Sequence, residues 1–393
     1  MLPMPIRPLN HQIRKAEKPL LILGGAALLA LVLTQLEFNL LESTLYDWRM
    51  SHQKADTSNS IVLVTVDQRS AAGLDEFQPL SLENHARFIE IVAGMSPRAL
   101  GYIIDLSDSA RLTPDAMIGP SQRIVDAANR IEAQGNIFLV GSSFDVTGEI
   151  VPPFPLSLLP RAISTLHKDG NVFAEDKTTR RAFTQINRRD TFPVQLARRM
   201  GALRIDRPIK GEYPIPSGLD ASAFFFRYRG PTDVMIEGSP RFGGEWPYRQ
   251  FSFIDVLQGK IPEGAFKDRI VLVSTLAKDD SADFSYTPYS KDPYTNPRIL
   301  LHASILDSLL HNDGISQAPG CINFSNTFVV CAFVMWWVTS STPLYGVFLT
   351  LGLASGFLLV GWVLFQTNGI WIRESQPLIG IFLSYYLTVP YRL

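Results

Sequence analysis

The sequence predicts an α/β domain with a largely parallel or mixed sheet and helical cover, together with four transmembrane helices, one before the domain and three after it. Three observations lead to this prediction. The stretch from Gly314 to Ile372 contains no Asp, Glu, Lys, Arg or His. A second uncharged stretch lies near the N-terminus, directly after a basic segment. Between them, short β-branched runs alternate with helical stretches, a pattern typical of βαβ units.

The N-terminal segment predicts an uncleaved transmembrane helix. Residues 1–18 carry Arg7, Arg14, Lys15 and Lys18 against a single acid, and we expect them to form a cytoplasmic basic tail. Residues 19–38 are expected to form the first transmembrane helix. A secretory signal peptide is the alternative, but its apolar region usually spans about 7 to 15 residues and ends at a small-residue cleavage site, which is missing here.

Residues 321–391 predict three further transmembrane helices, at about 324–341, 344–365 and 376–391. Crossing a bilayer takes about 20 apolar residues in a helix. Buried helices of a soluble protein would need polar faces, which these segments lack. An even number of crossings places both termini in the cytoplasm and the large middle domain on the other side. Cys321 and Cys331 are ten helical steps apart, about 15 Å, which is too far for a disulfide.

Residues 39–320 are expected to form one extracytoplasmic domain, because no linker or repeat interrupts them. The segment from Leu41 to Arg49 keeps helical spacing and predicts a stalk that continues the first transmembrane helix as one rod. Asp47 and Arg49 on this stalk are therefore candidates for relaying a signal. The net charge of −1 argues against binding to nucleic acid.

The domain begins with alternating strands and helices, which predict a largely parallel sheet. Strands are expected at 61–67, 99–105 and 136–141, with helices at about 85–94 and 121–134 between them. After a proline-rich stretch the pattern predicts a short strand following Arg180-Arg181, helices at 192–200, 251–257 and 299–310, and strands at 224–230 and 267–273.

Two of these strands end in an acid, and this suggests a polar site. Asp67 and Asp105 follow consecutive strands, and ligands of open α/β sheets bind beyond the carboxyl ends of the strands. With His85, Asp283 and His302 they are our candidate ligand-binding residues, as a polar or metal cluster on one rim. The alternative is that these acids cap the following turns or helices and pair with arginines.

No residue pattern indicates catalysis, a metal site or a cofactor. The histidines lack His-x-x-x-His or Glu-x-x-His spacing, and Ser70 and Ser274 follow strands outside any Gly-x-Ser-x-Gly motif. The basic pairs at 180–181, 188–189 and 198–199 either read an anionic ligand or form a solvated face. Gly352 and Gly356 give one transmembrane helix a small face, which packs the bundle internally or mediates dimerisation.

The order of several short motifs resembles a type 2 CHASE domain, an extracytoplasmic sensor module. The first half supplies Tyr46-Asp47-Trp48-Arg49, the strand ending at Asp67, His85-Ala86 and Asp105. The second half supplies the run from Asp255 to Pro262, the run from Phe266 to Val273, Thr287-Pro288 and the run from His302 to Asp307. The chain departs from the family pattern at two places: it has Ser274 where relatives usually carry Gly, and Phe77-Gln78-Pro79-Leu80 where they carry a Trp-Pro-Trp-like patch.

The resemblance implies a receptor in the bacterial inner membrane, with a large domain in the periplasm or outside and an unknown ligand there. Its expected partners are membrane lipid, a second copy in a homodimer, and a cytoplasmic output domain or partner protein. In this family the output is commonly a histidine kinase, a nucleotide cyclase or a Ser/Thr kinase after the last helix. We expect residues 392–393 to begin such an output region. The alternatives are an envelope scaffold that binds a partner without signalling, or a hydrolase using the rim carboxylates.

Overall fold

The computed structural model describes residues 9–53, 57–112, 118–145, 148–170, 175–204, 207–215, 220–233, 245–277, 283–292 and 294–392. The chain divides into two compact units. The helical unit comprises residues 1–49 and 317–393, and the α/β unit comprises residues 50–316.

The α/β unit is built on a six-stranded sheet with the order β11-β1-β12-β2-β3-β6, and every neighbouring pair is parallel. Its strands are β1 (Ile61–Val66), β2 (Ala99–Tyr102), β3 (Ile137–Ser142), β6 (Arg161–Ile163), β11 (Arg249–Ser252) and β12 (Ile270–Thr275). Strands β1 and β2 are buried along their whole length, which is why charged residues do not alternate with apolar ones: β1 reads Ile-Val-Leu-Val-Thr-Val and β2 reads Ala-Leu-Gly-Tyr. The predicted α/β fold with a parallel sheet is confirmed.

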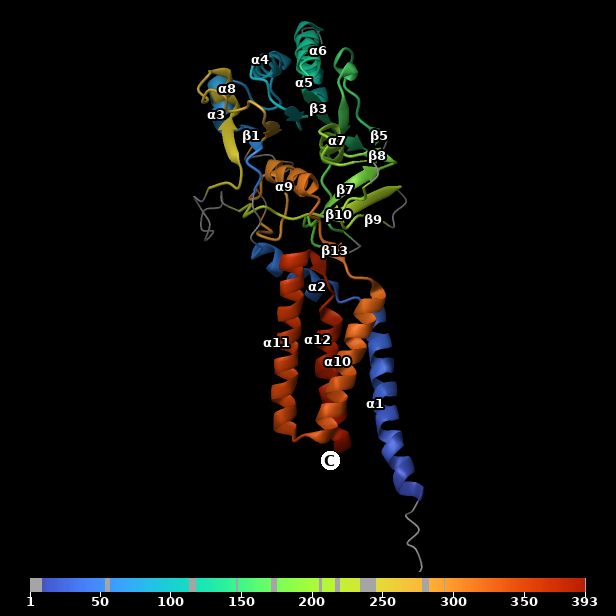
Figure 1. Cartoon of the computed structure of the whole chain (residues 1–393). Coiled ribbons are helices and arrows are strands. Elements are labelled where there is room, and N and C mark those ends of the chain that lie inside the picture. The colour runs from blue at the N-terminus through green and yellow to red at the C-terminus, as the bar shows by residue number, and fades with distance from the viewer. Residues whose placement is uncertain are drawn as a thin grey trace, which may run out of the picture. The chain divides into compact units, whose positions relative to one another are not determined.

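Helices cover both faces of this sheet. Helices α4 (Leu82–Ala93), α6 (Ile118–Ala133) and α8 (Phe253–Leu257) pack into one core with alternate residues of the strands, including Val64, Leu100 and Phe138. The short helices α3 (Gln68–Leu74) and α5 (Leu106–Leu112) contact α8 and α4 respectively. On the other face lie α7 (Phe192–Arg199) and α9 (Arg298–His311), which contact each other (Figure 1).

A second, antiparallel sheet has the strand order β8-β7-β10-β9. Its strands are β7 (Arg181–Ile186), β8 (Arg189–Asp190), β9 (Tyr213–Pro214) and β10 (Ala221–Phe225). The remaining elements of the unit are the hairpin of β4 (Phe144–Asp145) with β5 (Gly148–Glu149) and the 3-10 helix η1 (Leu156–Leu158). Strand β13 (Ser316–Gln317) spans the boundary between the two units in the sequence.

The helical unit contains α1 (Leu9–Gln35), α2 (Asn39–Ser51) up to Arg49, α10 (Gly320–Ser340), α11 (Pro343–Asn368), β14 (Ile370–Trp371), α12 (Ser375–Thr388) and η3 (Val389–Arg392). Helix α10 packs against α1, α11 and α12. Among the described residues, three helical segments are long and apolar enough to cross a membrane: Lys18–Gln35, Gly320–Ser340 and Leu344–Asn368. Helix α12 has 14 residues, or about 21 Å, against about 30 Å of hydrocarbon core.

Three local predictions need correction. The expected continuous rod is interrupted, because residues 36–38 are not helical and separate α1 from α2. The predicted strand at 224–230 lies earlier, since β10 ends at Phe225 and the next five residues form no strand. The helix predicted from Phe251 begins at Phe253, because the preceding residues pair with β1 as the edge strand β11.

Candidate functional site

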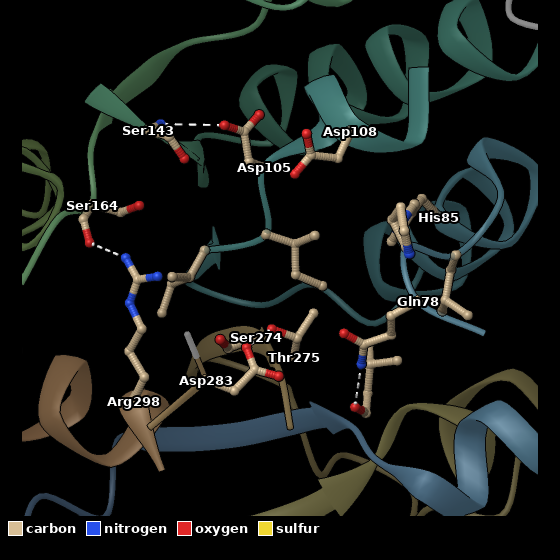
Figure 2. A pocket seen from close by; sticks show the side chains of 15 residues that line it. Gln78, His85, Asp105, Asp108, Ser143, Ser164, Ser274, Thr275, Asp283 and Arg298 are labelled. Atoms are coloured by element: carbon tan, nitrogen blue, oxygen red, sulfur yellow. Dashed lines mark hydrogen bonds between the residues drawn. The ribbon is translucent and has the colours of Figure 1, made fainter. Parts of the chain in front are cut away.

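A cavity of about 270 Å³ opens at the carboxyl edge of the parallel sheet. We call it the rim pocket. Its walls come from the ends of β1 and β12, from the segments that follow β2, β3 and β6, and from the first turn of α9. Figure 2 shows Asp105 and Asp108 along one side, with Asp283 and Thr275 across from them. In open α/β sheets this edge is where ligands bind, because the loops after the strands converge there.

Asp105 is held by main-chain groups on two elements. It follows β2, and its Oδ1 accepts a hydrogen bond of 2.9 Å from the Ser107 backbone N–H. Its Oδ2 accepts a longer one, 3.3 Å, from the Ser143 backbone N–H after β3. Asp108 stands one turn further on, and its side chain is 63% exposed. The two carboxylates therefore belong to one wall of the rim pocket.

The opposite side contains a buried carboxylate and a guanidinium. Asp283 is 5% exposed, and its carboxylate accepts hydrogen bonds from the Thr275 hydroxyl and from the Ala277 backbone N–H. Arg298, in the first turn of α9, donates to the Ser164 carbonyl at 2.7 Å (Figure 2). Groups of both charges thus line the same small cavity.

His85 closes one end of the rim pocket as a neutral ring. Its Nδ1 lies 2.5 Å from the Tyr102 hydroxyl and its Nε2 lies 3.2 Å from the Ser109 hydroxyl. Burial lowers the pKa of His85 to about 4, since a charged imidazole would lose its hydration there. Both ring nitrogens are thus engaged within the protein, and His85 adds no charge to the pocket at neutral pH.

Asp67 lies outside the rim pocket and caps a helix. Its Oδ1 accepts from the Ser70 backbone N–H at 2.9 Å and from the Ser252 hydroxyl at 2.8 Å. This is the N-cap arrangement of α3, in which the side chain satisfies a free N–H of the first turn. The capping alternative considered from the sequence is the one observed for this residue.

His302 also lies away from the rim pocket. It is 2% exposed on α9, and its ring meets Phe192 of α7 edge to face, with centroids 6.3 Å apart. Burial holds the pKa of His302 well below its usual value. Its neighbour one turn earlier, Arg298, lines the pocket instead. Of the five candidate residues, His85, Asp105 and Asp283 are thus brought together, while Asp67 and His302 are not.

Most polar residues that line the rim pocket, including Arg298, were not among the candidates predicted from the sequence. One signal was present: both departures from the family pattern fall on the rim pocket, because Gln78, Pro79, Leu80 and Ser274 all line it. Gln78 is anchored by donating from Nε2 to the Val66 carbonyl at 3.0 Å. Apart from the exposed Phe77, the residues of these two departures therefore lie in the lining of the rim pocket.

The basic pair at residues 180–181 neither binds an external anion nor forms a solvent-exposed surface. Arg180 and Arg181 are at most 1% exposed and share the buried carboxylate of Asp169. Arg180 also binds Asp176 through two hydrogen bonds of 2.9 and 2.6 Å, and Lys291 binds the same carboxylate. Both arginines thus form ion pairs inside the protein.

The helical unit contains a second buried polar group, which we call the α2–α12 cluster: Glu42, Arg49, Trp371, Glu374 and Ser375. Oε1 of Glu42 accepts from Trp371 Nε1 at 2.7 Å, and Oε2 accepts from the backbone N–H groups of Glu374 and Ser375 at 3.0 Å each. The Arg49 guanidinium is 1% exposed and lies 3.5 Å from Glu42 and 3.2 Å from Glu374. The relay candidate Arg49 therefore joins α2 to the start of α12, and Asp47, the other candidate, is buried on the same helix.

Gly352 and Gly356 lie where none of the described residues approaches their Cα atoms closely. A Cβ added at either glycine would meet nothing within 4 Å, and both line a shallow apolar groove with Trp337 and Tyr345. The close approach occurs at Gly380 instead, where an added Cβ would come within 2.7 Å of the Cys331 sulfur. Both cysteines are free thiols, with Cys321 exposed and Cys331 buried.

Among the residues that the structure describes, no group of three or more His, Cys, Asp or Glu side chains is placed to hold a metal ion. The rim pocket is lined by hydrogen-bonding groups, charged side chains and a small apolar surface.

Comparison with models of known protein families identifies the family to which the chain belongs. The model of the CHASE2 domain matches residues 25–342, and the chain belongs to this family of sensory domains. The match covers the whole α/β unit and extends into the apolar helices on both sides of it. No curated protein and no solved structure matches the chain.

Proposed function

We propose that this protein is a transmembrane signal receptor that binds a small extracytoplasmic molecule in the rim pocket and relays binding through its helical unit. The observation that carries the proposal is the coincidence of a sensory domain family with a polar cavity at the carboxyl edge of a parallel sheet. The proposal places the protein in a bacterial inner membrane, as a homodimer that acts on a cytoplasmic output domain or partner.

The membrane layout in this proposal has four crossings, α1, α10, α11 and α12. Three of them have the length and composition that a crossing requires. The fourth, α12, is short, but η3 continues it without interruption to Arg392, and it packs against α10 and α1. Basic residues at the N-terminal end of α1, ahead of its apolar part, favour a cytoplasmic N-terminus, and four crossings return the C-terminus to the same side.

The relay in this proposal runs through the α2–α12 cluster. Glu42 and Arg49 stand on α2, which leads to the α/β unit in the sequence, whereas Glu374 and Ser375 begin the last helix. A buried ion cluster responds to small displacements because its charges have no water to replace a lost partner. A movement of α2 would therefore change the hydrogen bonds that hold the start of α12.

Labelling of introduced cysteines tests the layout. Cys321 and Cys331 are first replaced by Ser, and single cysteines are then placed at the exposed positions Asp126 and Lys18. A membrane-impermeant maleimide should label position 126 on intact cells from which the outer membrane has been removed, and position 18 only after lysis. Labelling of both positions from the same side would exclude the receptor layout.

Hydrogen exchange tests the relay on the full chain in lipid nanodiscs. Asp108→Trp places a large side chain at the mouth of the rim pocket, and Asp126→Trp is the matched control at an exposed site on α6. We expect the pocket variant, and not the control, to change exchange at the Glu374 and Ser375 amides by about fivefold or more, roughly 1 kcal/mol in local opening. Unchanged exchange in both variants would contradict a relay from the pocket to α12.

A further inference from the structure

We propose that the ligand of the rim pocket is a small organic amine, bound as its ammonium form by Asp105 and Asp108. This inference rests on the proposed function and specifies the ligand class of the same site. It follows from the charge of the lining, the free acceptor positions of Asp105, and the size and apolar wall of the cavity.

The charge of the lining favours a cation. Three carboxylates line the rim pocket, those of Asp105, Asp108 and Asp283, against the single guanidinium of Arg298. The histidine in the lining is neutral, because its ring is buried between the Tyr102 and Ser109 hydroxyls. The described lining thus has an excess of two negative charges, and a cationic ligand would reduce their mutual repulsion.

Asp105 has the free acceptor positions that an ammonium group needs. A carboxylate offers about four lone-pair positions, and Asp105 uses two of them, both for uncharged backbone N–H groups. Asp108 forms its ion pair with Arg111 at 3.6 Å, and both side chains are more than 60% exposed, so solvent weakens that pair. The charge on this wall is therefore available for a charge-assisted hydrogen bond from a ligand.

The size and the remaining walls favour an organic ligand over an inorganic ion. A volume of about 270 Å³ is slightly smaller than the roughly 300–1,000 Å³ of pockets that hold drug-sized ligands, and it exceeds what one hydrated ion requires. Val66, Leu80 and Ile103 give the pocket an apolar surface for a short carbon chain. Hydroxyl groups of Ser164, Ser274 and Thr275 lie in the same lining and can bind additional donors.

Thermal unfolding of the full chain in lipid nanodiscs tests this class with defined probes. The amines are putrescine and ethanolamine, the neutral isosteres are 1,4-butanediol and ethylene glycol, the anion is succinate, and the inorganic cation is calcium. We expect millimolar amine to raise the Tm by roughly 2–4 °C, as for a ligand in large excess over its Kd, and the isosteres to leave it unchanged.

Variants localise the effect. Asp108→Asn alters an exposed side chain that the fold does not need, so it should fold normally and bind the amines about tenfold more weakly. Asp105→Asn should weaken binding at least as much, and the exposed control Asp126→Asn should not weaken it. Equal amine affinity in wild type and in both pocket variants would overturn the inference, as would stabilisation by calcium equal to that by amine.

The same titration separates failure of this inference from failure of the proposed function. Stabilisation by succinate that is lost in Arg298→Gln would show that the rim pocket binds ligands but that the amine class is wrong. No stabilisation by any probe would also overturn the amine inference. The receptor proposal itself is judged by the labelling and exchange experiments, which use no ligand.

Discussion

The Glu42 carboxylate accepts a hydrogen bond from the Ser375 backbone N–H, although 333 positions separate these two residues. The first N–H groups of a helix lack partners and carry partial positive charge, so a carboxylate there stabilises the helix. The residue before α12, Glu374, makes no side-chain cap of its own. The last helix is therefore capped by a residue of α2, which makes its start depend on the position of α2.

Replacing Glu42 by Ala is expected to destabilise the helical unit strongly. The change removes the acceptor for Trp371 Nε1 and for two backbone N–H groups, and it removes one of the two carboxylates beside buried Arg49. Breaking such a buried pair lowers the free energy of unfolding by about 3–5 kcal/mol. Thermal unfolding in nanodiscs should show this loss as a lower midpoint. Glu37→Ala is the control, because Glu37 is exposed and its removal should cost less than about 0.5 kcal/mol. Similar midpoints for both variants would refute the cap.

The helical unit should lose stability as the pH rises from about 4.5 to about 7. Burial raises the pKa of Glu374 to about 7, with Arg49 opposing the shift and Glu42 adding to it. In this window the folded form binds more protons than the unfolded form, so deprotonation costs stability, in total about 3 kcal/mol. Above about pH 7 the contribution of Glu374 is constant.

Thermal unfolding of wild type and Glu374→Gln across this pH range measures the effect. The stability of the variant should depend less on pH. Between pH 5 and pH 8 it should therefore lose less stability than wild type does. A pH dependence identical to that of wild type would show that Glu374 does not titrate in this window.

The α/β unit should show the opposite dependence through His85. Its folded pKa of about 4 lies below the unfolded value of 6.5, because burial disfavours the charged ring. Between these values the unfolded form binds more protons, so stability is lost as the pH falls, by about 3 kcal/mol in total. His85→Gln should reduce the slope of the pH profile between about 6.5 and 4 and leave the part that buried His302 contributes, as followed by near-UV circular dichroism. His311→Gln, at a half-exposed histidine of the same unit, is the comparison.

Substitution of Gly101 tests the packing of α7 on the sheet. A Cβ at this position would come within 2.7 Å of Leu272 and 3.1 Å of the Phe192 ring, so Gly101→Ala should cost about 1–3 kcal/mol by overpacking. Gly119→Ala, where an added Cβ meets nothing within 4 Å, should leave the stability equal or slightly higher. Denaturant unfolding of the two variants makes the comparison, and equal midpoints would contradict the tight contact.

Local burial explains which elements could be predicted from sequence. Strands β1, β3 and β12 are mostly buried runs rich in Val, Ile and Leu, and a pattern of that kind is visible in the chain itself. Strand β11 is the contrary case: Arg249 to Ser252 is polar and partly exposed, and it is a strand because it pairs with the edge of β1. Its pairing depends on a strand far earlier in the sequence, with Arg249 opposite Val62, so no local pattern could have revealed it.

The sequence by itself determined the apolar helices, the parallel sheet and the family, because hydrophobic period and motif order are local properties of the chain. Only the tertiary structure decided that Asp105 and Asp283 share a cavity with Arg298 while Asp67 caps α3. It also decided that the predicted rod breaks, where Gln376 binds the Leu36 carbonyl that the break exposes. These outcomes depend on which distant groups satisfy each buried charge and hydrogen bond, and that is settled only when the whole chain is packed.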